Sequence, residues 1–168
     1  MHTFRSLSPN QIDPIFDRIG KEWMLITADS GKDVNTMTAS WGGCGILWNH
    51  PVAFAFVRPQ RHTFAVLEDT DHFTLAFFDE RYRDALRYCG SHSGRDGDKF
   101  AASGLSPVRC KGFAYPAEAS LVLICKKLYV QDMKEECFLD PSLLSHYEKK
   151  DFHRVYVGEI LEALVNNE

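Results

Sequence analysis

Two arginines and a threonine lie close together in the segment RPQRHT, directly after the apolar run PVAFAFV. The residues are Arg58, Arg61 and Thr63. Arginine presents a planar fork of N–H donors that matches a phosphate, and a threonine hydroxyl adds another donor. The segment therefore predicts an anion site at the end of a strand, although a solvated turn with two surface arginines has the same sequence.

A second polar segment, SHSGRDGDK, offers Ser91, Ser93 and Lys99 around Gly94 and Arg95. Its glycines make it flexible, and its backbone amides can wrap around a phosphate. Taken alone, the segment also fits an exposed connection between two helices. If both segments face one ligand, that ligand is expected to carry a phosphate.

The third segment, VNTMTASWGG, places polar residues between two stretches that are rich in aliphatic and aromatic side chains. Those polar residues are Asn35, Thr36, Thr38 and Ser40. An extended segment of this kind can hydrogen-bond the edge of a flat heterocycle, and Trp41 and Trp48 offer aromatic surface nearby. An ordinary strand followed by a turn is the alternative.

Several common kinds of site are excluded by their missing motifs. The chain has no GxGxxG, GxxxxGK[ST] or GxSxG sequence, which argues against a Rossmann, P-loop or nucleophile-elbow enzyme. Its seven histidines form no HxxxH pair, and its five cysteines form no CxxC pair and are odd in number. We therefore expect no metal site and no disulfide framework.

The elements that would position these residues are mostly strands. Apolar runs rich in β-branched and aromatic residues predict strands at residues 22–28, 35–40, 52–57, 72–78, 120–130 and 152–164, with a returning arm at 134–138. The sequence WGGCG is expected to end the second strand. Helices are expected at 79–90, closed by Gly90, at 96–103, closed by Gly104, and at 141–147.

Composition limits the class of protein. At 168 residues the chain fits one domain, residues 1–168, since domains commonly span about 100 to 200 residues. Many strands with few helices favour a β-barrel or sandwich with helical insertions. A net charge of −4 recommends neither nucleic acid nor an anionic membrane as a partner. No signal sequence or apolar run of ~18 residues is present, so we expect a soluble, cytoplasmic protein.

The chain resembles the flavin reductase-like family of FMN-binding split β-barrels, close to its flavoredoxin branch. The resemblance runs from about Trp23 to Ile160 and is carried by five segments in order: NTMTASWGG, PVAFAFVRPQRHT, HFTLAFF, SGRDGDKF and HRVYVGEI. It implies a mainly β split barrel with a few peripheral helices that binds FMN. It also implies a homodimer with the site at or near the subunit interface.

The resemblance also implies roles for individual residues. The isoalloxazine and ribityl parts of FMN would lie along Asn35, Thr36, Met37, Thr38, Ser40 and Trp41. Candidates for the phosphate and its approach are Arg58, Arg61 and Thr63, and the loop that closes over the ribityl phosphate would contain Ser91, Ser93 and Lys99. His153 is the candidate catalytic residue near the flavin or nicotinamide, with a core-facing histidine as the alternative.

The expected function is that of an FMN-dependent oxidoreductase that takes electrons from NADH or NADPH and passes them through FMN to free flavin or another acceptor. The polar residues of VNTMTASWGG would meet the hydrogen-bonding edge of the flavin. Two alternatives stay open. One is a flavoredoxin-like electron carrier that exchanges electrons with a redox protein partner, and the other is a protein that binds a cofactor without redox turnover.

Overall fold

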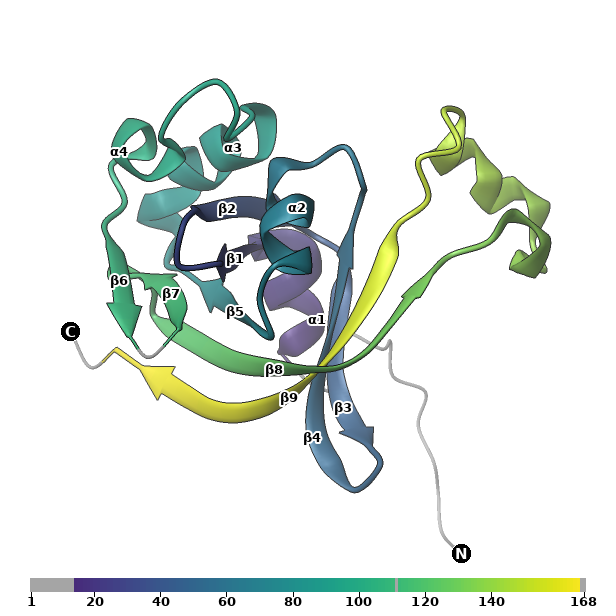
Figure 1. Ribbon diagram of the computed structural model, residues 1–168, viewed down its shortest axis with the longest axis horizontal. Helices are drawn as coiled ribbons and strands as arrows, with labels where there is room; N and C mark the ends of the chain where they lie inside the picture. Colours follow the sequence, from purple (N-terminus) through teal and green to yellow (C-terminus); the bar gives the residue numbers. More distant parts are fainter. Residues whose placement is uncertain (1–13, 111, 167–168) are drawn as a thin grey trace, which may run out of the picture.

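The fold is built on one curved antiparallel sheet of seven strands (Figure 1). The computed structural model describes residues 14–110 and 112–166. The strands of the sheet are β1 (Met24–Asp29), β2 (Val34–Ala39), β3 (Gly42–Leu47), β4 (His50–Val57), β5 (His72–Phe77), β8 (Leu121–Asp132) and β9 (Arg154–Val165). Their order is β2-β1-β5-β8-β9-β4-β3. Strands β6 (Pro107–Cys110) and β7 (Phe113–Pro116) form a separate pair.

Short helices accompany the sheet. They are α1 (Ile15–Asp17), the π-helix η2 (Arg18–Glu22), α2 (His62–Glu68), the 3-10 helix η3 (Glu80–Tyr82), α3 (Arg83–Ser91), α4 (Lys99–Ser103), and the 3-10 helices η4 (Glu135–Cys137) and η5 (Pro141–Tyr147). The predicted mainly β split barrel with a few helices is confirmed. The sheet is not closed, because its edge strands β2 and β3 are not neighbours in the described sheet.

Apolar side chains are buried on both faces of the sheet, as the nearly uninterrupted apolar runs predicted. In β1, Met24 and Ile26 belong to one core cluster, which also contains Val66 and Leu67 of α2. Leu25 lies in a second cluster with residues of α3 and α4. Helix α2 therefore covers one face of the sheet, and helices α3 and α4 cover the other. All three helices also contact β2.

Four differences from the predicted elements concern the seven-stranded sheet and the helices beside it: two elements were not predicted, and two predictions are wrong. Strand β2 ends at Ala39, before WGGCG, as predicted, but residues 42–47 then form β3, which was not predicted. Strand β3 pairs with β4 over the full register from Gly42↔Ala55 to Leu47↔His50. Helix α2 was not predicted. Residues 134–138 form no returning strand, because β8 pairs with β9 instead. Helix α3 continues through Gly90 to Ser91, and Gly90 lies where a Cβ would be 3.3 Å from Thr38 Cβ.

Strands β8 and β9 form a long hairpin within the sheet, in which β8 pairs with β9 alone beyond Lys126 while residues 154–159 of β9 also pair with β4. Register shifts at Ile124/Cys125 and Lys127/Tyr129 interrupt their pairing, and bulges of this kind bend and twist a strand pair. The connection between the strands contains η4 and η5 and projects to the upper right of Figure 1. We call residues 141–153, which include the predicted helix η5, the tip segment.

Candidate functional site

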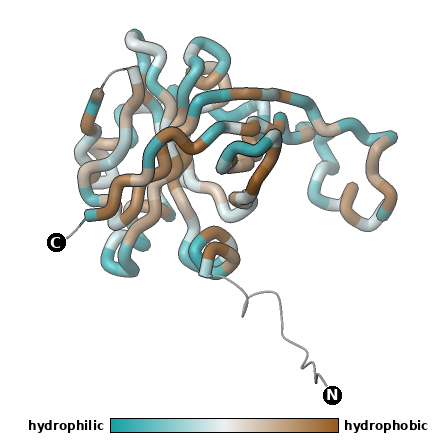
Figure 2. Tube along the Cα trace, turned by 90° about the horizontal axis from the view of Figure 1, so that it is seen from below, coloured by the Kyte–Doolittle hydropathy of each residue, from teal (hydrophilic) through white to brown (hydrophobic). Residues whose placement is uncertain are grey.

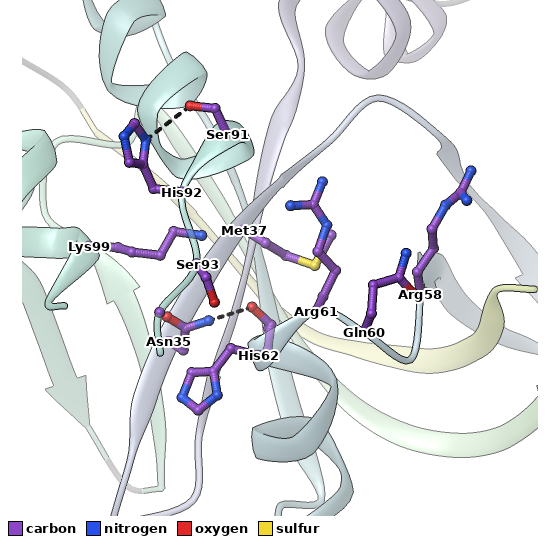
Figure 3. A pocket seen from close by; sticks show the side chains of 12 residues that line it. Asn35, Met37, Arg58, Gln60, Arg61, His62, Ser91, His92, Ser93 and Lys99 are labelled. Carbon is purple, nitrogen blue, oxygen red and sulfur yellow. Dashed lines mark hydrogen bonds between the residues drawn. The ribbon is translucent and has the colours of Figure 1, made fainter. Parts of the chain in front are cut away.

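A cavity of about 510 Å³ opens between β2, the start of α2 and the loop after α3 (Figure 3). It is lined by Asn35, Met37, Arg58, Gln60, Arg61, His62, Thr63, Ser91, His92, Ser93, Gly94 and Lys99. The two polar segments that predicted an anion site, residues 58–63 and 91–99, thus face the same space. We call this space the main cavity.

A smaller cavity of about 170 Å³ adjoins it and shares Met37, Arg58 and Arg61 with it. Its remaining lining residues are Thr38, Ala39, Ser40, Trp41, Phe56 and His153. We call it the aromatic cavity. The lining of the two cavities thus contains residues from all three predicted segments, 34–43, 58–63 and 91–99, and also His153.

Thr36 is the predicted site residue that lines neither cavity. Its side chain is completely buried, and its hydroxyl accepts a hydrogen bond from Thr27 Oγ1 at 2.9 Å. It also donates to the Ile26 carbonyl at 3.3 Å. Successive residues of a strand point to opposite faces. Asn35 and Met37 line the main cavity, and Met37 also packs in the core cluster that contains Ile26. Thr36 points to the opposite face, where it bonds to β1.

Trp48 also lies away from the site, contrary to the prediction that it supplies aromatic surface there. It occupies the turn between β3 and β4 with a φ of +51°, followed by Asn49 with a φ of +62°. Its ring contacts Tyr129 on β8 at a centroid separation of 6.2 Å. Positive φ at both central residues is the geometry of a type I′ hairpin turn, so Trp48 has a structural role.

Two cations of the main cavity are held by the C-terminal end of α3. Arg61 Nη1 donates to the Gly90 carbonyl at 2.9 Å, and the Lys99 ammonium donates to the Cys89 carbonyl. The last carbonyls of a helix carry partial negative charge and attract cations. Lys99 is only 5% exposed, and its burial lowers its pKa to about 8.

No carboxylate is among the residues that line the main cavity. Arg61 and Lys99 are therefore partnered there by neutral carbonyl groups, which do not cancel their charge. A guanidinium and an ammonium held in a partly buried cavity attract an anion more strongly than surface cations do. The main cavity can therefore accommodate an anion.

Arg58 is held differently from the other two cations. Its Nη1 donates to Asp151 Oδ2 at 2.6 Å and its Nη2 donates to the His146 carbonyl at 2.9 Å. The hydrogen bond from Arg58 keeps the pKa of Asp151 below its usual range. The charge of Arg58 is thus balanced by a carboxylate of the tip segment.

A close backbone approach forms one wall of the main cavity. Asn35 Nδ2 donates to Thr63 Oγ1 at 2.7 Å, and Gly94 packs so tightly against this pair that a Cβ there would collide with Asn35 Oδ1 and lie 2.8 Å from His62 Cδ2. His62 Nε2 lies 2.7 Å from Asp33 Oδ2. Only glycine fits at position 94, which explains a glycine in a loop that borders the cavity.

The serine hydroxyls are arranged unequally. Ser91 Oγ donates to the Arg87 carbonyl at 2.9 Å and so turns back toward its own helix. Ser93 Oγ accepts from the Arg95 backbone N–H at 3.2 Å, which leaves its own hydrogen for another acceptor. Figure 3 shows the Ser93 hydroxyl between Lys99 and Asn35. Of the two serines, Ser93 is therefore the better placed to donate a hydrogen bond to a group in the main cavity.

His153 is buried at the wall of the aromatic cavity. Its ring lies 5.3 Å from that of Trp41 and 6.5 Å from that of Phe56, measured between centroids. Its Nδ1 lies 2.8 Å from the Tyr147 hydroxyl. Burial, with the nearby Arg58 charge as a smaller cause, lowers the pKa of His153 to about 4. The imidazole is therefore neutral at neutral pH.

Some lining residues were not among the predicted set. They are Ala39, Phe56, Gln60, His62, His92 and Gly94. His62 stands between Arg61 and Thr63 in the sequence, so recognition of helix α2 would have pointed to it. Phe56 carried no signal beyond the apolar strand that contains it.

Over residues 14–110 and 112–166, no group of three His, Cys, Asp or Glu side chains could hold a metal ion. Within the same ranges no helix has the length and apolar character to cross a membrane. Most of the N-terminal stretch in which no signal sequence was found, residues 1–13, lies outside the described residues.

Comparison with known proteins gives one family match. Residues 16–168 match the family model described as "Flavin reductase like domain". Curated proteins include no match to this chain.

Solved structures with a similar fold include three informative ones. Flavoredoxin from Methanosarcina acetivorans is 19% identical, with a TM-score of 0.68 over 87% of this chain and 69% of its own. An FMN-binding protein from Thermus thermophilus with bound p-hydroxybenzaldehyde is 20% identical, with a TM-score of 0.69 over 99% and 83%. An NADH:FAD oxidoreductase from Streptomyces globisporus C-1027, in complex with NAD and FAD fragments, is 17% identical, with a TM-score of 0.66 over 96% and 87%. At these identities the similarity concerns the fold.

Proposed function

The chain belongs to the flavin reductase-like family, and from that premise we propose that it binds FMN and passes electrons from NADH or NADPH through the flavin to an acceptor. The acceptor would be free flavin, another small molecule or a redox protein. The observation that carries the proposal is the pair of adjoining cavities, one cationic and one aromatic, with Met37, Arg58 and Arg61 between them.

The residues of the main cavity fit a phosphate group. Arg61 and Lys99 supply charge with no lining carboxylate to oppose it, and Ser93 has a hydroxyl hydrogen to donate. The aromatic cavity fits the isoalloxazine, because Trp41 and Phe56 offer apolar surface while Ser40 and the edge of β2 offer polar atoms. Met37 lines both cavities and would lie along the ribityl chain between them.

When bound, FMN supplies the redox chemistry by accepting a hydride equivalent and releasing electrons to an acceptor. The chain's own residues bind and orient it. Arg61 and Lys99 fix the phosphate end, and the aromatic wall excludes water from the ring end. His153 stays neutral above about pH 4, so it adds no charge at the ring end and can act there as a hydrogen-bonding group.

Absorption spectroscopy of the purified protein tests the proposal directly. A flavin spectrum is expected after incubation with FMN and gel filtration, and it should bleach on anaerobic addition of NADH or NADPH. A flavin spectrum that persists with both donors, but bleaches with a low-potential protein donor, would favour an electron carrier like the flavoredoxin whose fold is similar. Persistence with every donor would leave a binding protein without redox turnover.

We predict that Arg61→Ala weakens FMN binding. Loss of one charge-assisted contact to a phosphate costs about 1.5 to 3 kcal/mol, so the Kd should rise roughly 10- to 150-fold. Flavin fluorescence titration measures the change. Arg87→Ala is the matched control, because Arg87 is an exposed arginine of α3 that lines neither cavity of the site. An unchanged Kd in Arg61→Ala would remove Arg61 from the phosphate site.

We also propose that the protein is a homodimer. The hairpin formed by β8 and β9 exposes large apolar side chains, namely Leu128, Tyr129, Val130, Leu139 and Leu143. Figure 2 shows hydrophobic stretches in the part of this hairpin that projects from the rest of the chain. Exposed apolar groups on a projecting element favour association with another chain. Sedimentation equilibrium is expected to give twice the mass of one chain, and a monomer mass at micromolar concentration would refute the dimer.

A further inference from the structure

The tip segment, although it lies at the end of a projecting hairpin, contacts the candidate site through a small number of residues. Its contacts converge on Arg58, which directly follows β4 and lines both cavities. This arrangement links the position of a distant chain segment to the shape of the site.

Arg58 contacts three residues of the tip segment. It donates to Asp151 at 2.6 Å and to the His146 carbonyl at 2.9 Å, and its guanidinium lies 5.1 Å from the centre of the Tyr147 ring. The side chains of Arg58 and Asp151 are 25% and 16% exposed. Water therefore screens the pair only partly, so its contribution exceeds that of a typical surface ion pair.

Asp151 is held from a second direction. Gln60, in the same turn as Arg58, donates its side-chain N–H to the same Asp151 oxygen. One carboxylate of the tip segment thus bonds to two residues of the turn that borders the main cavity. Because Arg58 keeps the pKa of Asp151 below its usual range, the carboxylate is charged throughout the neutral pH range.

The same segment forms one wall of the aromatic cavity. His153 lines that cavity directly. His146 packs edge-on against Trp41 at 5.3 Å between ring centroids, and Tyr147 contacts His153 through a 2.8 Å hydrogen bond. Displacement of the tip segment would therefore open the aromatic cavity at Trp41 and His153.

Arg58 is poorly placed to bind the phosphate itself. Figure 3 shows its guanidinium on the far side of the cavity from Lys99 and Ser93, beyond Arg61. Its charge is already balanced by Asp151. Of the two arginines that the sequence offered for an anion, Arg61 fits that role and Arg58 fits another.

We propose that Asp151 is a positioning residue that, through Arg58, holds the tip segment closed over the ring end of the flavin site and so sets how fast the flavin enters and leaves. This inference rests on the proposed function and deepens it. A closed tip segment would retain FMN as a prosthetic group, whereas an open one would let FMN exchange as a substrate.

The test is the rate of FMN exchange in Asp151→Ala, measured by stopped-flow fluorescence. Association and release are both expected to be at least about tenfold faster, because the substitution removes the hydrogen bonds from Arg58 and Gln60 to the carboxylate, while the Kd changes by less than about threefold. Asp151→Asn keeps an acceptor without the charge and should give an intermediate rate.

Asp132→Ala is the matched control. Asp132 also pairs with an arginine, Arg154 at 2.6 Å, and lies on the same hairpin, but it lines neither cavity. The rates of FMN association and release in Asp132→Ala should equal those of the wild type. Equal acceleration in both variants would show that the hairpin matters only through its general stability, and would overturn the inference.

Hydrogen exchange of the flavin-free protein gives a readout that does not depend on FMN. Residues 141–153 are expected to exchange faster in Asp151→Ala than in the wild type and in Asp132→Ala. Unchanged exchange there, an unchanged release rate, or tighter binding with slower release would each overturn the inference. A wild-type protein that binds no FMN would overturn the proposed function, whereas wild-type binding with unaltered exchange kinetics in Asp151→Ala overturns this inference alone.

Discussion

Replacement of Lys99 by methionine is expected to raise the Kd for FMN roughly 10- to 150-fold at pH 7, corresponding to about 1.5 to 3 kcal/mol for a hydrogen bond to a charged group. Lys99 is nearly fully buried beside the main cavity, and the Cys89 carbonyl accepts one of its three N–H donors. A phosphate would supply the negatively charged partner that this buried ammonium lacks. Because water screens a buried cation little, we expect the loss to lie toward the upper end of this range.

The same residue predicts a pH dependence of binding. The pKa of Lys99 is lowered from 10.5 to about 8 in the folded protein, chiefly by burial. The folded chain therefore releases a proton that the unfolded chain keeps, so this group destabilises the flavin-free protein below about pH 8, and the cost is relieved as the pH rises from about 8 to 10.5. A bound phosphate favours the protonated amine, so affinity for FMN should fall as the pH rises through about 8.

Flavin fluorescence titrations between pH 6.5 and 9.5 measure both effects. The methionine variant should lose the part of the pH dependence that is centred near pH 8. Lys126→Met is the matched control, because Lys126 is an exposed lysine on β8 that lines neither cavity. Wild-type affinity in Lys99→Met would show that the phosphate lies elsewhere.

The strands of the core could be predicted from the sequence because a strand that is buried on both faces appears as a nearly uninterrupted apolar run. Leu25 and Ile26 are adjacent in β1 and pack in different clusters, so neither position tolerates a polar residue. Helix η5 was predictable for a local reason. Asp140 accepts a hydrogen bond from the Ser142 N–H and Pro141 begins the helix, which are signals that adjacent residues carry.

Strand β3 could not be predicted because its stability comes from its partner. Glycine weakens a strand by about 0.5 to 1 kcal/mol relative to alanine, and the run Gly42–Leu47 contains three glycines. The tight turn that pairs it with β4 uses Trp48 and Asn49 at positive φ, where asparagine and glycine are the usual signals. Helix α2 was missed because it is only seven residues long and follows a segment whose arginines suggested a turn.

The residue types of the candidate site could be predicted from the sequence, but the bonding partner of each residue could not. Arg58 and Arg61 are equivalent in the sequence, yet Arg61 bonds to the end of α3 and Arg58 bonds to Asp151, 93 residues away. The alternation of β2 places Thr36 on the opposite face from Asn35 and Met37. It also places Thr38 on the face of Thr36, yet Thr38 lines the aromatic cavity, so alternation alone does not identify the site residues. Contacts between segments that are distant in sequence, such as that of Arg58 with Asp151, produce no periodic pattern in the sequence.

Replacement of Gly158 by alanine is expected to destabilise the protein by about 1 to 3 kcal/mol, the usual cost of forcing an extra methyl group into a packed core. Gly158 lies in β9, opposite Ala53 of β4 and Lys127 of β8. A Cβ there would lie 2.6 Å from two ring atoms of Phe73 and 2.9 Å from Cys125 Cβ. The ring and Cys125 are both completely buried or nearly so, which leaves little room for either to move.

Thermal unfolding measures this loss, and the Tm should fall by roughly 2 to 4 °C for each kcal/mol in a chain of this size. Gly45→Ala is the matched control, because Gly45 is an exposed strand glycine and no atom lies within 4 Å of the position that the added methyl group would take. Phe73→Leu combined with Gly158→Ala should recover part of the loss, because the shorter side chain vacates the space that the methyl group needs. Equal Tm values for Gly158→Ala and Gly45→Ala would show that the Phe73 ring and Cys125 can move aside, and their close packing would then not be what requires glycine at position 158.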